Sequence, residues 1–139
     1  MPHGVTLVRA SYPLTTPAVS TARLAVVEAL RDQDASAALV DAVALAISEL
    51  GSNAVEAGHG NDFDVEVVFS PDPPRVVLRV ANAAELHQIP ARARWRPSDP
   101  LAARGRGLSI VDTLADGFEF TMAGGRLVAT ATFRGKVDR

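Results

Sequence analysis

The sequence of 139 residues has no cysteine and only one tryptophan and one tyrosine. Without cysteine, the chain has neither a disulfide framework nor a thiolate metal site, which fits a reducing compartment. No apolar run approaches the roughly 18 residues that a membrane-spanning helix needs. The first 16 residues lack the basic and then apolar pattern of an export signal. These absences predict a soluble, cytoplasmic protein.

An excess of positive charge is also missing. The chain has 14 lysines and arginines against 16 aspartates and glutamates, a formal net charge of −2. This balance argues against direct binding of nucleic acid, which depends on neutralising phosphates. The hydrophobic fraction of 47% and the charged fraction of 22% are ordinary for globular proteins. We therefore predict a single domain over residues 1–139 with a core of its own.

The pattern of apolar residues predicts three helices and five strands. In chain order, the expected elements are a strand at 5–10, helices at 15–33 and 34–58, strands at 63–69 and 75–81, a helix at 108–116, and strands at 118–122 and 126–133. Strands with one apolar face need a cover, and three helices are available to provide it. The economical arrangement is a two-layer α+β sandwich with the helices on one face of the sheet.

The first predicted helix has a clear start and an amphipathic pattern. Thr16 is the expected N-cap, and Pro17 takes the first helical position. Leu24, Val27 and Leu30 recur at helical spacing, so we expect them to form its buried stripe.

The second predicted helix has the strongest pattern in the chain, with Asp34 or Ser36 as its cap. Gly51 lies inside it, where glycine costs about 1 kcal/mol relative to alanine. This glycine is either merely tolerated or marks a close approach by another backbone. The expected buried stripe consists of Leu39, Val43, Ala46, Ile47, Leu50 and Ala54.

No period can be recognised between Asn82 and Arg104. An irregular stretch of about 20 residues is unusual in a compact domain and is often a lid or a binding loop. The alternative is a surface excursion without function. Trp95 lies in this stretch, and we expect it to anchor the segment against the rest of the protein.

Glu49 and Asn53 are four residues apart on the second helix, so their side chains point to the same side. A carboxylate in this place can orient or deprotonate an attacking hydroxyl. A carboxamide oxygen is a neutral ligand suited to Mg²⁺. By themselves, however, the two residues are also what the solvated edge of a helix presents.

Gly105 and Gly107 flank an arginine immediately before the third predicted helix. Glycine-rich turns ahead of a helix bind phosphate, because free N–H groups and the positive helix end point at the anion. We expect both glycines to adopt φ > 0 and to admit a phosphate closely, with Arg104 and Arg106 adding charge. A plain joint between loop and helix is the alternative. The long loop, the glycines and the helix edge together favour a nucleotide site.

Two segments resemble a known family. "ISELGSNAVEAG" resembles the N-box of the GHKL (histidine-kinase-like) ATPases, with the pattern E-x-x-x-N at Glu49 and Asn53. "RGRGLSIVDTLAD" resembles their second glycine box. The order of elements resembles their Bergerat-type sandwich, whose mixed, mostly antiparallel sheet is covered on one face by three helices. Within that superfamily, the small size resembles the anti-sigma-factor serine/threonine kinases.

The resemblance implies ATP and Mg²⁺ as cofactors, Glu49 as the general base and Asn53 as the Mg²⁺ ligand. It also implies an ATP lid at about 84–104. The implied partners are a small anti-anti-sigma protein, phosphorylated on serine or threonine, and a sigma factor that is sequestered; such relatives often form homodimers. Catalysis of phosphoryl transfer depends mainly on positioning the reacting groups and stabilising their charge. The implied nucleotide-binding residues are Asn53, Asn82, Arg104, Gly105, Arg106, Gly107 and Leu108.

The sequence departs from the family in the first glycine box, D-x-G-x-G, whose aspartate accepts a hydrogen bond from the adenine amino group. Here "VANAAEL" places Asn82 at the aspartate, and Ala84 and Leu86 at the glycines. Asn82 can still accept through its carbonyl oxygen. The loss of the charge costs roughly 1 to 2 kcal/mol, or about tenfold in affinity. We therefore expect weakened nucleotide binding.

Two functions from different classes follow from these patterns. One is an ATP-dependent protein kinase, and the other is a non-catalytic partner-switching module with weak or lost ATP binding. The altered first glycine box favours the module, whereas the intact N-box and second glycine box favour the kinase, which we predict. A histidine kinase fits less well, because His3, His59 and His87 lie in a terminus and in expected loops. An unrelated α+β protein is the fourth alternative.

Overall fold

The computed structural model describes residues 4–57, 59–83 and 103–135, and the side chains of residues 57, 59 and 103–106 lie outside the description. The lid predicted at about 84–104 therefore falls almost entirely outside the described residues. The same holds for five residues discussed above, namely His3, Ala84, Leu86, His87 and Trp95.

The described residues form five strands and three helices in the predicted order. The strands are β1 (Val5–Pro13), β2 (His59–Pro71), β3 (Pro74–Ala83), β4 (Gly117–Ala123) and β5 (Arg126–Arg134). The helices are α1 (Thr16–Asp32), α2 (Ala37–Ala57) and α3 (Ala103–Leu114). Every predicted element is present, and each strand extends beyond its predicted bounds.

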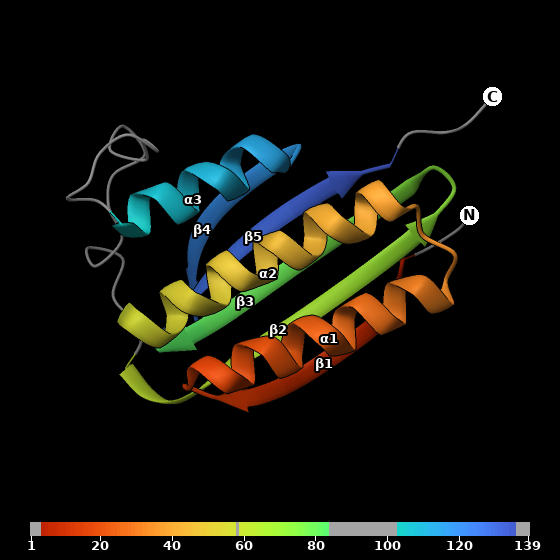
Figure 1. The fold of residues 1–139 in the computed structure, drawn as a ribbon. Helices are drawn as coiled ribbons and strands as arrows, with labels where there is room; N and C mark the ends of the chain where they lie inside the picture. The colour runs from red at the N-terminus through yellow and green to blue at the C-terminus, as the bar shows by residue number, and fades with distance from the viewer. Residues whose placement is uncertain (1–3, 58, 84–102, 136–139) are drawn as a thin grey trace.

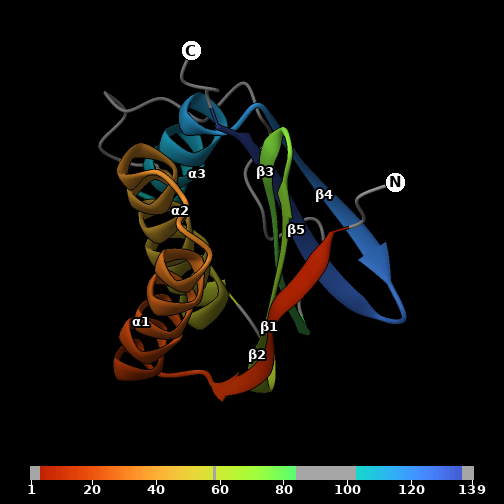
Figure 2. The same cartoon turned by 90° about the vertical axis from the view of Figure 1, so that its right-hand side faces the viewer.

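The strands form one sheet in the order β1-β2-β3-β5-β4, and all four pairings between neighbours are antiparallel. The three helices lie together on one face of the sheet, and no described element covers the other face (Figure 1, Figure 2). This is the predicted two-layer α+β sandwich. The sheet, expected to be mostly antiparallel, is antiparallel throughout these strands.

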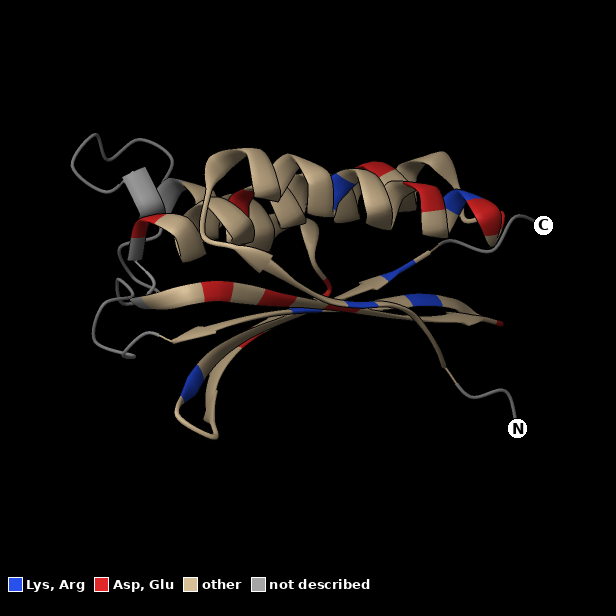
Figure 3. Ribbon diagram, turned by 90° about the horizontal axis from the view of Figure 1, so that it is seen from below, with Lys and Arg blue, Asp and Glu red and all other residues tan. Residues whose placement is uncertain are grey.

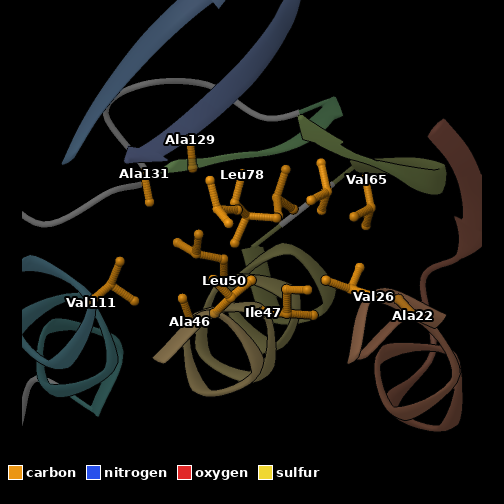
Figure 4. Packing of buried hydrophobic residues seen from close by; sticks show 14 of the residues in the cluster. Ala22, Val26, Ala46, Ile47, Leu50, Val65, Leu78, Val111, Ala129 and Ala131 are labelled. Atoms are coloured by element: carbon orange, nitrogen blue, oxygen red, sulfur yellow. The ribbon is translucent and has the colours of Figure 1, made fainter. Parts of the chain in front are cut away.

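The core lies between the helices and the sheet. Alternate residues of β3 point toward the helices and are buried, as in Val76, Leu78 and Val80. On the helix side, all six residues of the stripe predicted for α2 are buried. Figure 4 shows Ile47 and Leu50 of α2 in this layer below Leu78. Because apolar burial is the main favourable term in folding, this packing determines where α2 lies on the sheet.

Helix α1 differs from its prediction in two details. Its N-cap is Thr15, whose hydroxyl accepts a hydrogen bond from the Ala18 N–H at 3.3 Å, so the predicted cap, Thr16, is wrong by one residue. Leu24 was expected in the core but is 57% exposed. At about 100° per residue, Leu24 lies on the far side of the helix from Ala22. The buried stripe consists of Ala18, Val19, Ala22, Val26 and Leu30.

Helix α2 is capped by Ser36, whose hydroxyl accepts a hydrogen bond from the Leu39 N–H at 3.2 Å. By length and composition alone, the segment Ala37–Glu56 could also cross a membrane, but here it is half buried in the fold. A methyl group built on Gly51 would lie 2.7 Å from Cγ1 of Val19. The close approach considered for Gly51 is therefore real, although a side chain of α1 makes it, not a backbone.

Helix α3 begins earlier than predicted. The sequence places its start at Leu108, whereas the helix starts at Ala103. Gly105 and Gly107 therefore lie inside its first two turns. The expectation of φ > 0 at these glycines is wrong, because helical residues have negative φ. Alanine and arginine are good helix formers, and they offset the helix penalty of the two glycines.

Candidate functional site

The flank of α2 that faces α3 carries Glu49 and Asn53, one turn apart. The two helices are in contact and run in opposite directions (Figure 1). Earlier on the same flank, α2 has the small residue Ala46, and Figure 4 shows Ala46 and Val111 of α3 pointing into the space between the helices and the sheet. Both are fully buried. Apolar contacts therefore hold α3 beside the polar end of this flank.

The side chain of Glu49 lies against α3 at Gly107. A methyl group built on the Gly107 Cα would be 2.5 Å from Glu49 Oε2 and 3.5 Å from its Cδ. Real side chains do not approach this closely, so a residue with a side chain at 107 would displace the carboxylate. Two segments that are distant in the sequence, the N-box and the second glycine box, thus meet in the fold.

The amino end of α3 lies at the same end of the helix pair as Asn53. Ala103 lies one turn before Gly107 on α3, and Asn53 lies one turn after Glu49 on α2. Because the two helices are antiparallel, both steps lead toward the same end of the helix pair. The first four N–H groups of a helix have no partner within it, and this end carries partial positive charge. The amino end of α3 can therefore bind an anion at the end where Asn53 lies.

Asn53 has an unsatisfied polar atom. Its side-chain nitrogen, Nδ2, is buried and has no hydrogen-bond acceptor among the described residues. Such a donor costs about 1 to 3 kcal/mol, and a ligand is one source of the missing acceptor. A phosphate oxygen would satisfy it, and the carboxamide oxygen is of the type that Mg²⁺ binds. The residues present therefore fit a nucleotide with its metal.

The described residues do not by themselves form a metal-binding cluster. Within the described parts of the chain, no group of three or more His, Cys, Asp or Glu side chains could hold a metal ion. Mg²⁺ commonly keeps several waters and binds one or two protein groups together with substrate phosphates. Asn53 suits such a site, in which the protein contributes little of the coordination.

Asn82 and Leu108 differ in what they can offer a ligand. Asn82 continues the helix-facing row of β3 and is 7% exposed, the one buried polar side chain among those described. It lies at the end of β3 that is on the same side of the molecule as the carboxyl end of α2 (Figure 1). Leu108 is fully buried in the core. Only the backbone of Leu108 is therefore available for binding.

Electrostatics distinguish Glu49 from an ordinary surface acid. Burial raises the pKa of the Glu49 carboxyl, and the negative charge of Glu56 raises it further. Glu56 stands outside the two residues that define the N-box, yet its place seven residues after Glu49 puts it on the same helix face. A raised pKa suits a group that takes up a proton near neutral pH.

A hollow with a volume of about 480 Å³ lies on the uncovered face of the sheet. Its charged residues are paired: Glu66 forms ion pairs with Arg9 at 2.7 Å and with Arg79 at 2.9 Å. The hydrogen bond from Arg9 lowers the pKa of Glu66. Figure 3 shows both signs of charge along the strands. An acid held ionised in this way is a weak base, and no residue predicted for the site lies here.

The chain matches the family of histidine kinase-like ATPase domains over residues 12–132. The match runs from the end of β1 into β5 and includes both boxes of the candidate site. Among curated proteins, none matches this chain.

Two solved structures share the fold. One holds the RsbU and RsbW domains of Rv1364c from Mycobacterium tuberculosis, with a TM-score of 0.69 and 22% identity over 94% of this chain. Our chain spans only 32% of that chain. The other is the SiaB-SiaC complex from Pseudomonas aeruginosa, with a TM-score of 0.71, 14% identity, and coverage of 92% of this chain and 89% of that chain. At these identities the likeness concerns the fold, and it agrees with the sandwich described above.

We expect Glu49→Gln to stabilise the folded protein at neutral pH. Because the folded-state pKa of Glu49 is raised, its ionisation opposes folding, and the penalty is fully present above that pKa. The penalty is lost as the pH falls toward the unfolded-state value, where the carboxyl is protonated in both states. Denaturant unfolding from about pH 4 to about pH 8 should therefore show a gain that grows with pH. A gain independent of pH, or equal to that of the exposed Glu28→Gln, would contradict the burial of this charge.

Proposed function

This chain belongs to the family of histidine kinase-like ATPase domains, and from that premise we propose that it is an ATP-binding anti-sigma regulatory factor. In this proposal it phosphorylates a serine or threonine of a small anti-anti-sigma protein and sequesters a sigma factor. The contact between Glu49 and α3 at Gly107 carries the proposal. It joins a proton acceptor to a helix whose amino end suits phosphate.

The phosphates of ATP bind at the amino end of α3 in this proposal. The first N–H groups of the helix, from Ala103 onward, have no partner within the helix and can donate to them. Gly105 leaves room for a close approach, and Arg104 and Arg106 add positive charge. Asn53 donates its buried amino group to a phosphate oxygen and offers its carboxamide oxygen to Mg²⁺. Bound Mg²⁺ supplies positive charge that neutralises the phosphate oxygens.

Glu49 acts as the general base in the same proposal. The hydroxyl oxygen of the partner's serine or threonine forms a bond to the γ-phosphorus, and the bond to the oxygen bridging the β- and γ-phosphates breaks. The hydroxyl proton passes to a carboxylate oxygen of Glu49, and ADP leaves. Because burial raises the pKa of Glu49, its carboxylate accepts this proton more readily than an exposed carboxylate does.

Asn82 is proposed to receive the adenine amino group. Its place at the end of the helix-facing row of β3 supports this role. The carboxamide oxygen accepts the hydrogen bond without the charge of the family's aspartate, so we expect affinity to be about tenfold weaker.

The second candidate function is a non-catalytic partner-switching module on the same fold, and Asn82 is the observation that favours it. Two other observations favour a nucleotide site. The buried Nδ2 of Asn53 lacks an acceptor, and the carboxylate of Glu49 is partly desolvated. Both features lower the free energy of unfolding of the unliganded protein. A ligand that accepts from Asn53 and a reaction that needs a basic Glu49 would give each of them a role. We therefore place the kinase first.

Protein partners are proposed by analogy with the structural neighbours. SiaB was solved in complex with SiaC, and the RsbW domain was solved in one protein with RsbU. We infer that this chain also acts through protein contacts, with an anti-anti-sigma protein and a sigma factor, and that it forms a homodimer. The cytoplasm is the proposed location, where ATP and these partners occur together.

We expect ATP with Mg²⁺ to raise the melting temperature. ATP at ten times its Kd stabilises by about 1.4 kcal/mol. For a chain of this length, that gain corresponds to about 4 to 5 °C. Asn53→Ala should remove most of the Mg²⁺-dependent part, whereas Ser52→Ala, at an exposed neighbour on α2, should retain it.

Thermal unfolding with and without Mg²⁺ at millimolar ATP measures this effect. Equal shifts with and without the metal in the native protein would remove Asn53 from its role as ligand. No shift at all would favour the non-catalytic module.

We expect Glu49→Ala to keep ATP binding but to lose phosphoryl transfer, since removal of a general base costs roughly 10²- to 10⁴-fold in rate. The assay follows label from the γ-phosphate of ATP to a small candidate partner encoded near this gene. Glu28→Ala, at an exposed position on α1, should transfer at the native rate. An unchanged rate in Glu49→Ala would rule out the base role.

A further inference from the structure

Gly107 has a property that phosphate binding does not explain, which is that its missing side chain makes room for Glu49. We propose that Gly107 is a positioning residue that seats the Glu49 carboxylate against α3, so that the placement of α3 sets the placement of the acid. The catalytic consequence rests on the proposed function, whereas the contact itself does not.

The carboxylate of Glu49 occupies the space that a side chain at 107 would need. A methyl group built on Gly107 would meet Oε2 at 2.5 Å, Cδ at 3.5 Å and Cβ at 3.7 Å. The other described glycines with such close neighbours meet apolar groups: Gly4 meets Val68, Gly51 meets Val19, and Gly135 meets Pro74. Of the described glycines other than Gly105, Gly107 is the one whose nearest neighbour is an ionisable side chain.

Backbone conformation does not account for a glycine at this position. Gly107 lies inside α3 and has helical dihedral angles, which alanine adopts more readily. What glycine contributes here is therefore space.

Core packing opposes a movement of α3 away from a larger residue at 107. Leu108 and Val111, which follow Gly107 on α3, are both fully buried in the core. Moving α3 outward would open a cavity beneath them, and tightly packed cores resist this. A methyl group at 107 would therefore push the carboxylate of Glu49 aside and leave the helix in place.

Displacement of the acid would impair chemistry more than binding. Misplacement of a catalytic group by about 1 Å can cost roughly a hundredfold in rate. The phosphates are proposed to bind one turn earlier on the same helix, at its amino end. One element thus positions both the phosphates and, through Gly107, the base.

The first test separates positioning from phosphate contact. We expect Gly107→Ala to lower kcat for phosphoryl transfer roughly tenfold to a hundredfold, with little change in the KM for ATP. Gly51→Ala is the matched control, because it also forces a methyl group into a close helix contact, with Val19 and not with Glu49. It should lower the melting temperature but retain the native kcat. A raised KM with unchanged kcat in Gly107→Ala would make Gly107 a phosphate contact and overturn the proposal.

The second test does not depend on activity. Glu49→Asp shortens the acid by one methylene and leaves room for the new methyl group. In a double-mutant cycle of melting temperatures, the effect of Gly107→Ala should be more favourable in the Glu49→Asp background than in the native one, while Glu49→Asp and Gly51→Ala should have additive effects. Additive effects in both pairs would overturn the contact. If Gly107→Ala alone does not fold, recovery of folding by Glu49→Asp supports the contact, and failure to recover contradicts it. If the native protein transfers no phosphate, the kinase proposal fails while this cycle still tests the contact.

Discussion

The packing of α2 on the sheet and beside α3 places Glu49 and Asn53 of the candidate site. One face of α2 buries its apolar stripe on the sheet, and the adjacent flank presents Glu49 and Asn53 toward α3. Since the stripe is held by apolar burial, the flank cannot turn without disturbing the core. Val111 of α3 is buried in the same core, and Gly107 of this helix lies against Glu49. A hydrophobic constraint thus determines the geometry of a polar site.

The site reduces the stability of the fold in two places. Glu49 is an acid whose ionised form is disfavoured by burial and by Glu56, and Asn53 has a buried nitrogen without an acceptor among the described residues. An unpaired polar group in the core lowers the free energy of unfolding, so its replacement by an apolar residue would stabilise the fold. Beside a helix amino end these two features have a use, since phosphate oxygens can accept from Asn53 and a hydroxyl can give its proton to Glu49. On the open face of the sheet, Glu66 is instead paired with Arg9 and Arg79, which keep it ionised.

Much of this arrangement could be predicted from the sequence, and the failures have physical causes. The helical spacing of large aliphatic residues predicted the stripe of α2, and the same spacing placed Glu49 and Asn53 on one side. The prediction that Leu24 is buried was wrong because the small residue Ala22 lies on the buried face of α1 instead. A search for periodic large apolar residues overlooks such a small one. The predicted start of α3 was wrong because the prediction gave the two glycines more weight than the helix-forming residues around them. The contact at Gly107 is non-local, so no pattern along the chain could reveal it, although the family boxes indicated that the two segments meet.

The account centres on one claim, that the acid–amide flank of α2 and the amino end of α3 form a single nucleotide site. Titration of the ¹⁵N-labelled protein with ADP and Mg²⁺, followed by amide chemical shifts, tests this claim most directly. The account predicts the largest changes at Asn53, Gly107 and Asn82, with little change at Arg9 and Glu66 on the uncovered face of the sheet. Changes concentrated on that open face, with the amides of α3 unaffected, would contradict it.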